Sequence, residues 1–157
     1  MSMDPLRSDP DFRPRDLAAP PTIRPVMLLT FDVVFDPAAV EFAVDSAAEA
    51  GAELLVTDGV PLPIGNPAAV ALRTFGNAAV LRASEDVVRD ARARGVRARQ
   101  LLFNSPRPLN ATFDILHQQG VGLLVFGPER RALGRWRFRR ACRKLREQAP
   151  CLVWTNE

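Results

Sequence analysis

Short apolar runs recur along the chain after residue 24, and glycine, proline or charged residues bound each of them. Runs of this kind, rich in β-branched and large apolar side chains, are typical of buried strands. We therefore expect five strands, over residues 25–31, 52–57, 96–104, 120–127 and 151–154. The third run alternates apolar residues with Arg97 and Arg99, so we expect one face of it to meet water at a sheet edge.

Between these runs lie stretches in which apolar residues recur at helical spacing. They predict helices over residues 37–50, 84–94, 109–119 and 136–148. Strands and helices in strict alternation predict an α/β fold, namely a doubly wound parallel five-stranded sheet with helices on both faces.

Local signals predict where several helices begin and end. Asp36 is expected to cap the first helix, with Pro37 at its first position and Gly51 just after its end. Ser84 is expected to cap the second helix. Ala149-Pro150 should end the last one, because proline lacks an N–H to donate.

Residues 58–81 are the ambiguous part of the pattern. Glycines and prolines punctuate the first half of this segment, which predicts a loop. A short helix over 67–74 and a turn at Gly76-Asn77 could follow. Long connections of this kind are usually functional or mobile.

Length and composition set further bounds. The 157 residues suit one domain. The first 24 include five prolines and show no hydrophobic period, which predicts a disordered N-terminal arm (1–24) before a domain at 25–157. Two cysteines are too few for a disulfide framework, and no apolar run reaches the ~20 residues that span a membrane. We therefore expect a cytoplasmic protein without a membrane partner.

The scarcity of some residue types excludes several chemistries. His117 is the only histidine and Lys144 the only lysine. A zinc site of His and Cys needs more ligands than this, and a Gly-x4-Gly-Lys phosphate loop is absent. The sequence favours a non-enzymatic protein, so we assign no catalytic residue and no metal ligand.

The last third of the chain carries a distinctive order of features. An apolar run ends at Gly127, a loop with arginines and a glycine follows, and a helix then leads to Ala149-Pro150-Cys151 and another apolar run. This order resembles the C-terminal signature of the universal stress protein (UspA-like) family. Phe31-Asp32, a helix and a second strand resemble the start of the same family. The resemblance implies a flavodoxin-like sheet, of the adenine-nucleotide alpha hydrolase type, with strand order 3-2-1-4-5.

The resemblance also implies where a nucleotide would bind. In many members Gly-x2-Gly-x9-Gly-Ser/Thr places backbone amides around the ATP phosphates, and an Asp after the first strand contacts the adenine and ribose. The corresponding positions here give the nucleotide-binding candidates Asp32, Gly59, Gly127, Arg130, Gly134, Arg139 and Arg140. Arginine side chains at glycine positions fill the volume through which phosphates approach the backbone. ATP is therefore a possible but not a favoured cofactor.

The segment from Arg130 to Arg146 is strongly basic. It contains eight arginines and one lysine with no acid among them. The helical spacing predicts an outward face made of Arg139, Arg140, Arg143 and Arg146. Such a face either binds nucleic acid or another polyanion, or is simply a solvated helix surface.

The last apolar run, at the edge of the predicted sheet, carries no charge until Glu157. An uncharged edge strand tends to pair with another chain, and members of the family often dimerise through this strand. We therefore predict a homodimer with Leu152, Val153 and Trp154 at its interface.

Three functional hypotheses remain open at this point. The first is a stress-response or regulatory protein that is non-enzymatic, homodimeric and without tight ATP binding. The second is an adenine-nucleotide binding member whose arginines replace the glycine motif. The third is a nucleic-acid or polyanion binding protein that uses the basic helix.

Overall fold

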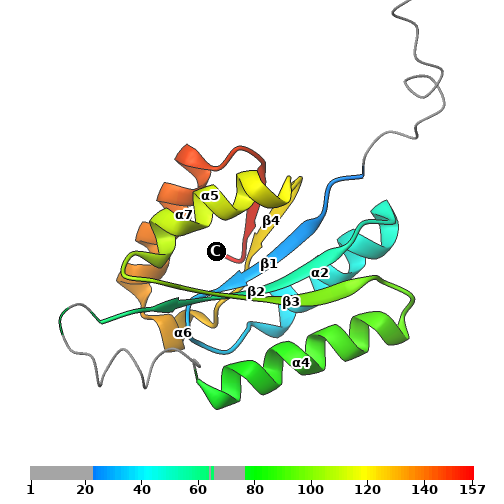
Figure 1. Cartoon of the computed structure of the whole chain (residues 1–157), viewed down its shortest axis with the longest axis horizontal. Helices are drawn as coiled ribbons and strands as arrows, with labels where there is room; N and C mark the ends of the chain where they lie inside the picture. Colours follow the sequence, from blue (N-terminus) through cyan, green and yellow to red (C-terminus); the bar gives the residue numbers. More distant parts are fainter. Residues whose placement is uncertain (1–22, 64, 66–76) are drawn as a thin grey trace, which may run out of the picture.

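A sheet of five strands runs through the part of the chain that this computed structural model describes, residues 23–63, 65 and 77–157. The strands are β1 (Val26–Thr30), β2 (Leu54–Pro61), β3 (Ala98–Ser105), β4 (Leu123–Phe126) and β5 (Leu152–Thr155). Their order is β3-β2-β1-β4-β5 and adjacent strands are parallel (Figure 1). The predicted fold and strand order are confirmed. Most of the predicted arm, residues 1–22, and the short helix over 67–74 lie outside the described residues.

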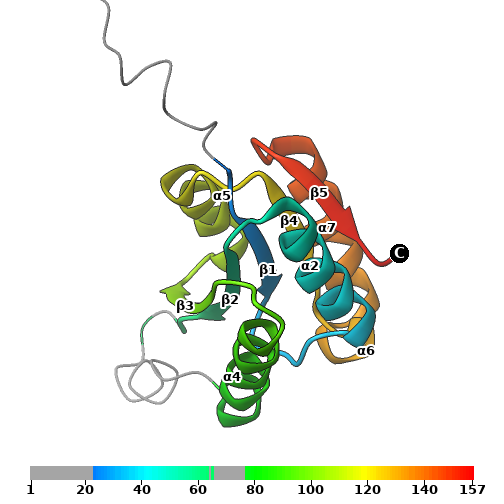
Figure 2. The same ribbon diagram turned by 90° about the vertical axis from the view of Figure 1, so that its right-hand side faces the viewer.

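In the described part of the chain, four long helices cover the two faces of the sheet, and a short helix lies at its carboxyl edge (Figure 1). One layer is formed by α2 (Pro37–Ala50) and α4 (Ala78–Ala93), and the other by α5 (Pro108–Gln119) and α7 (Arg135–Gln148). The short helix is α6 (Arg130–Leu133). Figure 2 shows β3 and β5 at opposite edges, so the predicted edge position of β3 is confirmed.

The central strand β1 separates two apolar cores. All of its residues are buried. Leu28 packs into the core beneath α2 and α4, whereas Met27 and Leu29 pack into the core beneath α5 and α7. This alternation follows from the two-residue period of a strand and explains why the run has no polar face.

The helix ends follow the predicted signals in one case and depart from them in another. The side chain of Asp36 accepts a hydrogen bond from the N–H of Ala38 at 3.0 Å and caps α2, as predicted. The Ser84 cap is wrong, because α4 begins at Ala78 and its N-cap is Asn77, seven positions before Ser84. The Ser84 hydroxyl instead donates to the carbonyl of Val80 at 2.9 Å, as a serine inside a helix does.

Strand β2 extends further than predicted. Residues 58–61, expected to form a loop, pair with residues 102–105 of β3. The extension places Gly59 inside the sheet, where a Cβ would lie 2.6 Å from Cζ of Phe103 and 2.9 Å from Cδ1 of Phe31. Only a glycine lets these two rings cover the strand here.

The connection from β4 to β5 is more helical than predicted. The expected loop before the last helix folds into α6, and α7 begins one residue after it. Gly134, at φ 95°, joins the two helices in a backbone conformation that favours glycine. Its N–H donates to the carbonyl of Arg130 and its carbonyl accepts from Phe138, both at 2.9 Å.

Candidate functional site

Main-chain contacts join the two loops at the switch point between β1 and β4, where the strand order reverses. Ligands of doubly wound sheets commonly bind in the crevice at this point. Here the N–H of Asp36 donates to the carbonyl of Gly127, and that of Glu129 to the carbonyl of Val34, both at 2.9 Å. Phe35 and Pro128 form an antiparallel bridge between the same two loops. These contacts join the two loops that follow the nucleotide-binding candidates Asp32 and Gly127.

Gly127 has a packing role that needs no ligand. A Cβ at this position would lie 2.7 Å from Cδ1 of Leu28 and 2.9 Å from Cβ of Ala39. The glycine therefore lets α2 approach the end of β4. Arg130 and Gly134 stand within the short helical connection, where their backbone groups serve helix hydrogen bonds. The amides that would surround phosphates in a glycine loop are thus committed in part to α6 and α7.

Asp32 adopts a left-handed conformation at φ 57°, which is uncommon outside glycine. Its N–H donates to Oδ1 of Asp58 at 2.8 Å. Asp58 is only 3% exposed, and burial is the main reason that its pKa rises from 3.8 to about 6. The hydrogen bond from Asp32 opposes this rise.

Asp58 is a residue of interest that sequence reasoning missed. It was assigned to the start of a loop, whereas it lies within β2 opposite Thr30 of β1. The available signal was a carboxylate following a run of buried strand residues, next to a glycine. Its position in the sheet depends on pairing with both neighbouring strands, which a local pattern does not contain.

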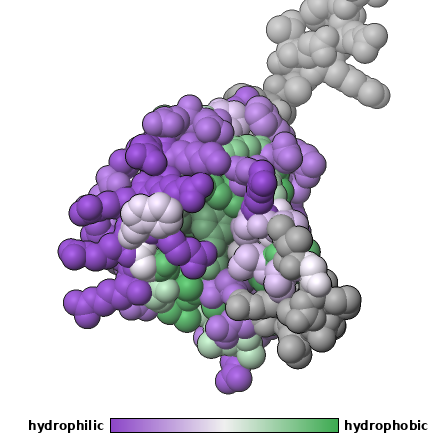
Figure 3. Space-filling view, turned by 90° about the vertical axis from the view of Figure 1, so that its left-hand side faces the viewer, coloured by the Kyte–Doolittle hydropathy of each residue, from purple (hydrophilic) through white to green (hydrophobic). Residues whose placement is uncertain are grey.

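A cavity of about 570 Å³ opens between α5 and α7, next to the carboxyl ends of β1 and β2. We call it the α5–α7 cavity. Apolar side chains form part of its lining: Phe31, Leu109, Leu133 and Trp136. Cationic side chains form another part: Arg107, Arg137, Arg140 and Lys144. Figure 3 shows an apolar hollow bordered by hydrophilic side chains on this side of the molecule.

Trp136 is the most exposed aromatic side chain named in this cavity, at 71%. The guanidinium of Arg140 lies over its ring, 5.5 Å from the centroid, at a distance suited to a cation–π contact. Lys144 donates to Oδ1 of Asn110 at 2.7 Å and so links α7 to α5. An exposed ring beside fixed cations can bind an aromatic anion by stacking and by ion pairing.

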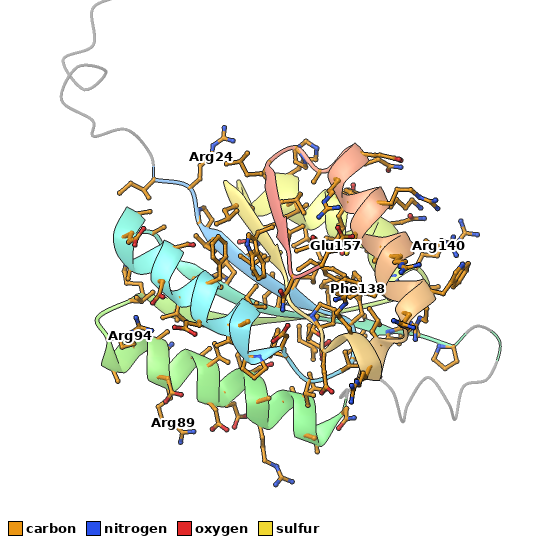
Figure 4. The ribbon with its side chains drawn as sticks, turned by 180° about the vertical axis from the view of Figure 1, so that it is seen from behind. Arg24, Arg89, Arg94, Phe138, Arg140 and Glu157 are labelled. Atoms are coloured by element: carbon orange, nitrogen blue, oxygen red, sulfur yellow. The ribbon has the colours of Figure 1, made fainter. Side chains whose placement is uncertain are left out.

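The arginines predicted to form one outward face point to different surroundings. Arg139 lies with three other arginines in a second hollow, and Arg140 lines the α5–α7 cavity. In Figure 4, Arg140 extends from the outer side of α7 while Phe138 lies beneath the helix. Arg143 is exposed. Arg146 is bound by Glu157, with Nη1 and Oε2 2.7 Å apart, so the predicted continuous polyanion face is divided.

The three residues predicted at a dimer interface also differ from one another. Leu152 is 74% exposed on the outer edge strand. Val153 is half-buried and packs against the core beneath α5 and α7. Trp154 is half-buried as well, and its ring stacks on Phe42 of α2 with centroids 4.5 Å apart.

Other chemistry finds little support in the described residues. Among them, no three His, Cys, Asp or Glu side chains are grouped as a metal site would require. Burial raises the pKa of the Cys142 thiol to about 11, so its thiolate is scarce at neutral pH. In the same part of the chain, every helix is too short or too polar to cross a bilayer.

The architecture as a whole is that of a doubly wound α/β protein with its candidate cavities at the carboxyl edge of the sheet. No family model matches the sequence, and no curated protein matches it. Solved structures do match, and many of them are universal stress proteins. The chain therefore has the universal stress protein fold, and the resemblance predicted from its sequence is confirmed in the fold.

Three of these structures illustrate the similarity. UspA from Lactobacillus plantarum is 19% identical with a TM-score of 0.65, over 87% of this chain and 100% of that one. The Archaeoglobus fulgidus universal stress protein in complex with dAMP is 17% identical with a TM-score of 0.63, over 87% and 100%. An Arabidopsis thaliana family protein with AMP bound is 16% identical with a TM-score of 0.55, over 83% and 90%.

Proposed function

We propose that this chain is a divergent, non-enzymatic universal stress protein that senses a nucleoside phosphate in the α5–α7 cavity and lacks tight ATP binding. The observation that carries this proposal is the combination of an exposed Trp136 with Arg140 and Lys144 in a single cavity. The family resemblance suggests a regulatory role in a stress response of the cytoplasm.

Size and chemistry of the cavity support a nucleoside phosphate as the ligand. A volume of about 570 Å³ lies within the range of small-molecule sites. A base can stack on the indole of Trp136, since every base presents a π-face. The guanidinium of Arg140 can then bind phosphate oxygens through paired hydrogen bonds. Two proteins of the same fold carry dAMP and AMP in their solved structures.

The closed crevice supports the second half of the proposal. A ligand at the Asp32 and Gly127 positions would have to displace the main-chain hydrogen bonds between the loops after β1 and β4. Affinity for ATP is therefore expected to be weaker than about 1 μM, a binding free energy of about −8 kcal/mol. A monophosphate needs only the ring and the cations of the α5–α7 cavity.

Calorimetry with AMP and with ATP tests this assignment. Arg140→Gln is expected to weaken AMP binding by about tenfold, the effect of one charge-assisted hydrogen-bonded pair. Arg143→Gln is the matched control, because Arg143 is exposed on the same helix and does not line the cavity. In Trp154→Phe, which leaves Trp136 as the only indole, AMP should still change the fluorescence.

Two results would overturn the assignment. One is AMP affinity that is unchanged in both Arg140→Gln and Trp136→Ala. The other is submicromolar ATP binding that Asp32→Ala abolishes, which would restore the nucleotide to the crevice between β1 and β4.

We also propose that the protein is a homodimer that pairs through β5. The exposed Leu152 supports this proposal, since a large apolar side chain on an open edge strand favours association. The stacking of Trp154 on Phe42 indicates that Trp154 stabilises the edge strand from within the chain. In this proposal Leu152, and not Trp154, makes the main side-chain contact with the partner.

A further inference from the structure

The layer formed by α2 and α4, which lie side by side in Figure 4, contains an apolar groove between the two helices. Its volume is about 540 Å³. We call it the α2–α4 groove. Its apolar lining belongs to the core beneath these helices or packs against it, and comes from Phe35, Val40, Val44, Ala83 and Val87. Part of this apolar surface therefore remains open to water, which favours an occupant.

Acidic side chains stand on both walls of the α2–α4 groove. Glu41 on α2 and Asp90 on α4 are exposed, and neither takes part in an ion pair among the described residues. Two further charged residues of the lining, Asp86 and Arg94, already have ion-pair partners. Helix α2 as a whole contains three acids and no base. The groove therefore fits an occupant with an apolar centre and positive charge around it.

The first turns of α7 present these complementary features. Trp136 is 71% exposed. Arg139 and Arg140 follow it by three and four positions, so the helix places both beside the ring, and Arg135 precedes it. The whole helix contains seven cationic residues and one acid. Tryptophan and arginine are enriched among the residues that dominate the binding energy of protein interfaces.

We propose that Trp136 of one copy of this chain enters the α2–α4 groove of a second copy, where Arg135 and Arg139 meet Glu41 and Asp90. The groove and α7 lie on opposite layers of the sheet, so the two cannot meet within one molecule (Figure 4). The occupant is a second copy because this chain itself carries the apolar centre and the positive charge that the groove requires. The contact joins two different surfaces head to tail and is separate from pairing through β5.

The ring and the charges have different parts in this contact. Entry of the indole removes its apolar surface and that of the groove from water, which supplies most of the attraction. Exposed ion pairs at the rim add little affinity, but they increase the rate of association and disfavour wrong orientations. The association should therefore be weak and strongest at low ionic strength, where screening is least.

This contact does not rest on the function proposed for the α5–α7 cavity. A base stacked on Trp136 would cover the ring that enters the groove, so the two kinds of binding exclude each other in one molecule. The tests below contain no nucleotide. A failure to bind AMP would therefore leave this proposal intact, and a failure to associate would leave the proposed function intact.

Sedimentation velocity at low ionic strength, at concentrations from tens to hundreds of micromolar, measures the association. Every protein carries Leu152→Lys, so that the pairing proposed for β5 does not contribute. This parent should self-associate, and Trp136→Ala should weaken its association at least about thirtyfold, as the loss of a central tryptophan at an interface does. The double variant Glu41→Arg/Asp90→Arg should weaken it at least about tenfold, because like charges then meet across the contact.

A matched control separates the groove from the overall charge of the protein. Glu49→Arg/Glu85→Arg changes the net charge by the same amount on the same two helices. Both positions are exposed and neither lines the groove. The control should associate as the parent does.

A mixture of two variants tests the partner directly. Arg135→Glu/Arg139→Glu reverses the charge on the other half of the contact, and this variant alone should also associate at least about tenfold more weakly than the parent. Mixed with Glu41→Arg/Asp90→Arg it should form complexes that contain both variants, since each groove then meets a helix of opposite charge. Restored association would also show that both variants are folded.

Three results would overturn the proposal. The first is a parent that stays monomeric at hundreds of micromolar in low salt, which would mean that the groove does not bind a second copy. The second is association that is as strong in Trp136→Ala as in the parent, or that Glu49→Arg/Glu85→Arg weakens as much as the groove variant does. The third is a mixture of the two charge-reversed variants that associates no more than each variant alone.

Discussion

The two amphipathic helices α4 and α7 lie on opposite faces of the sheet, and their arginine side chains have different partners. On α4, Arg89 pairs with Asp86 in the same helix, and Arg92 donates to the carbonyl of Ala98 at 3.0 Å. Arg94, which follows the helix, pairs with Asp45 at 2.5 Å. Two arginines of this layer, Arg89 and Arg94, thus have acidic partners.

On α7, five of the seven cationic side chains line one of two hollows, and only Arg146 has an acidic partner among the described residues. Both helices have buried apolar faces and are held by their packing, so arginine pairing is not what stabilises α7 as a helix. We infer from this difference that a helix with acids among its arginines presents a partly neutralised surface to water. A helix without such acids keeps positive charge that a ligand can bind.

The strongest test of the comparison removes the packing that anchors α7. Phe138 is 1% exposed, and its ring lies 5.5 Å from that of Phe126 in β4. Phe138→Ala is expected to cost about 3–5 kcal/mol of the free energy of unfolding. Denaturant titration measures this loss, with Arg137→Ala, on an exposed position of the same helix, as its control. A cost below about 1 kcal/mol would mean that α7 is not held by its core contacts.

The second test concerns Asp58, a buried carboxylate that takes part in none of the ion pairs among the described residues. Its pKa is raised from 3.8 to about 6 in the folded protein, so the folded state binds more protons between these pH values. The free energy of unfolding should therefore fall by up to about 3 kcal/mol as pH rises through this range, and stay low above it.

Asp58→Asn removes the charge and keeps an oxygen that can accept from the N–H of Asp32. At pH 7 this variant should be more stable than wild type, and its stability should change less between pH 4 and pH 6. Thermal unfolding across that range measures both effects, with the exposed Asp114→Asn as control. A loss of stability with rising pH that is equally steep in wild type and in Asp58→Asn would contradict the assignment to Asp58.

The two edges of the sheet extend the comparison. At β3, Arg99 is bound to Glu53 with Nε and Oε1 2.6 Å apart, which blunts that edge. At β5, Leu152 is exposed, and the strand contains no charged residue. Leu152→Lys should weaken the proposed homodimer and leave the fold intact, as seen by sedimentation at tens of micromolar. Leu152→Lys is preferred to a lysine at Val153, which is packed against the core.

A wild-type protein that sediments as a monomer at these concentrations would remove the pairing proposal. A Leu152→Lys dimer as tight as wild type would show that the chain associates through another surface.

The smallest expected effect is on surface charge. Arg89→Glu replaces an ion pair with Asp86 by two like charges, so it should lower the melting temperature. Arg139→Glu relieves the repulsion among the four arginines that line the second hollow and should raise the melting temperature. Both changes should be below about 1 kcal/mol and should shrink in 1 M salt, where the screening length is about 3 Å. Changes in melting temperature of the same sign in the two variants would contradict the proposed difference between the arginines of α4 and α7.

The fold was predictable because its information is local. Buried strands appear as apolar runs, and Asp36 and Gly51 each predict a helix end without information from the rest of the chain. The start of α4 was missed because Asn77 and Ser84 are both good caps, and only the packed helix distinguishes them. The extension of β2 was missed because it depends on pairing with β3, which is remote in sequence.

The candidate sites were predictable only in part. Arg130, Arg139 and Arg140 were named from the sequence, but their division between two hollows depends on the turn at Gly134. The α5–α7 cavity draws residues from five segments of the chain, including Phe31. Trp136 stood next to these arginines in the sequence without a signal that it would be exposed in a cavity.

The main-chain closure between the loops after β1 and β4 also constrains how this protein could evolve. Because peptide groups make the closure, a substitution other than to proline keeps the donors and acceptors of those hydrogen bonds. A glycine-type phosphate loop would need extra residues between Gly127 and α7, which is an insertion and not a substitution. Selection for ATP binding from a library of point mutants should therefore recover changes around the two hollows. A library with insertions after Gly127 should in addition recover variants that bind ATP through a glycine-type phosphate loop.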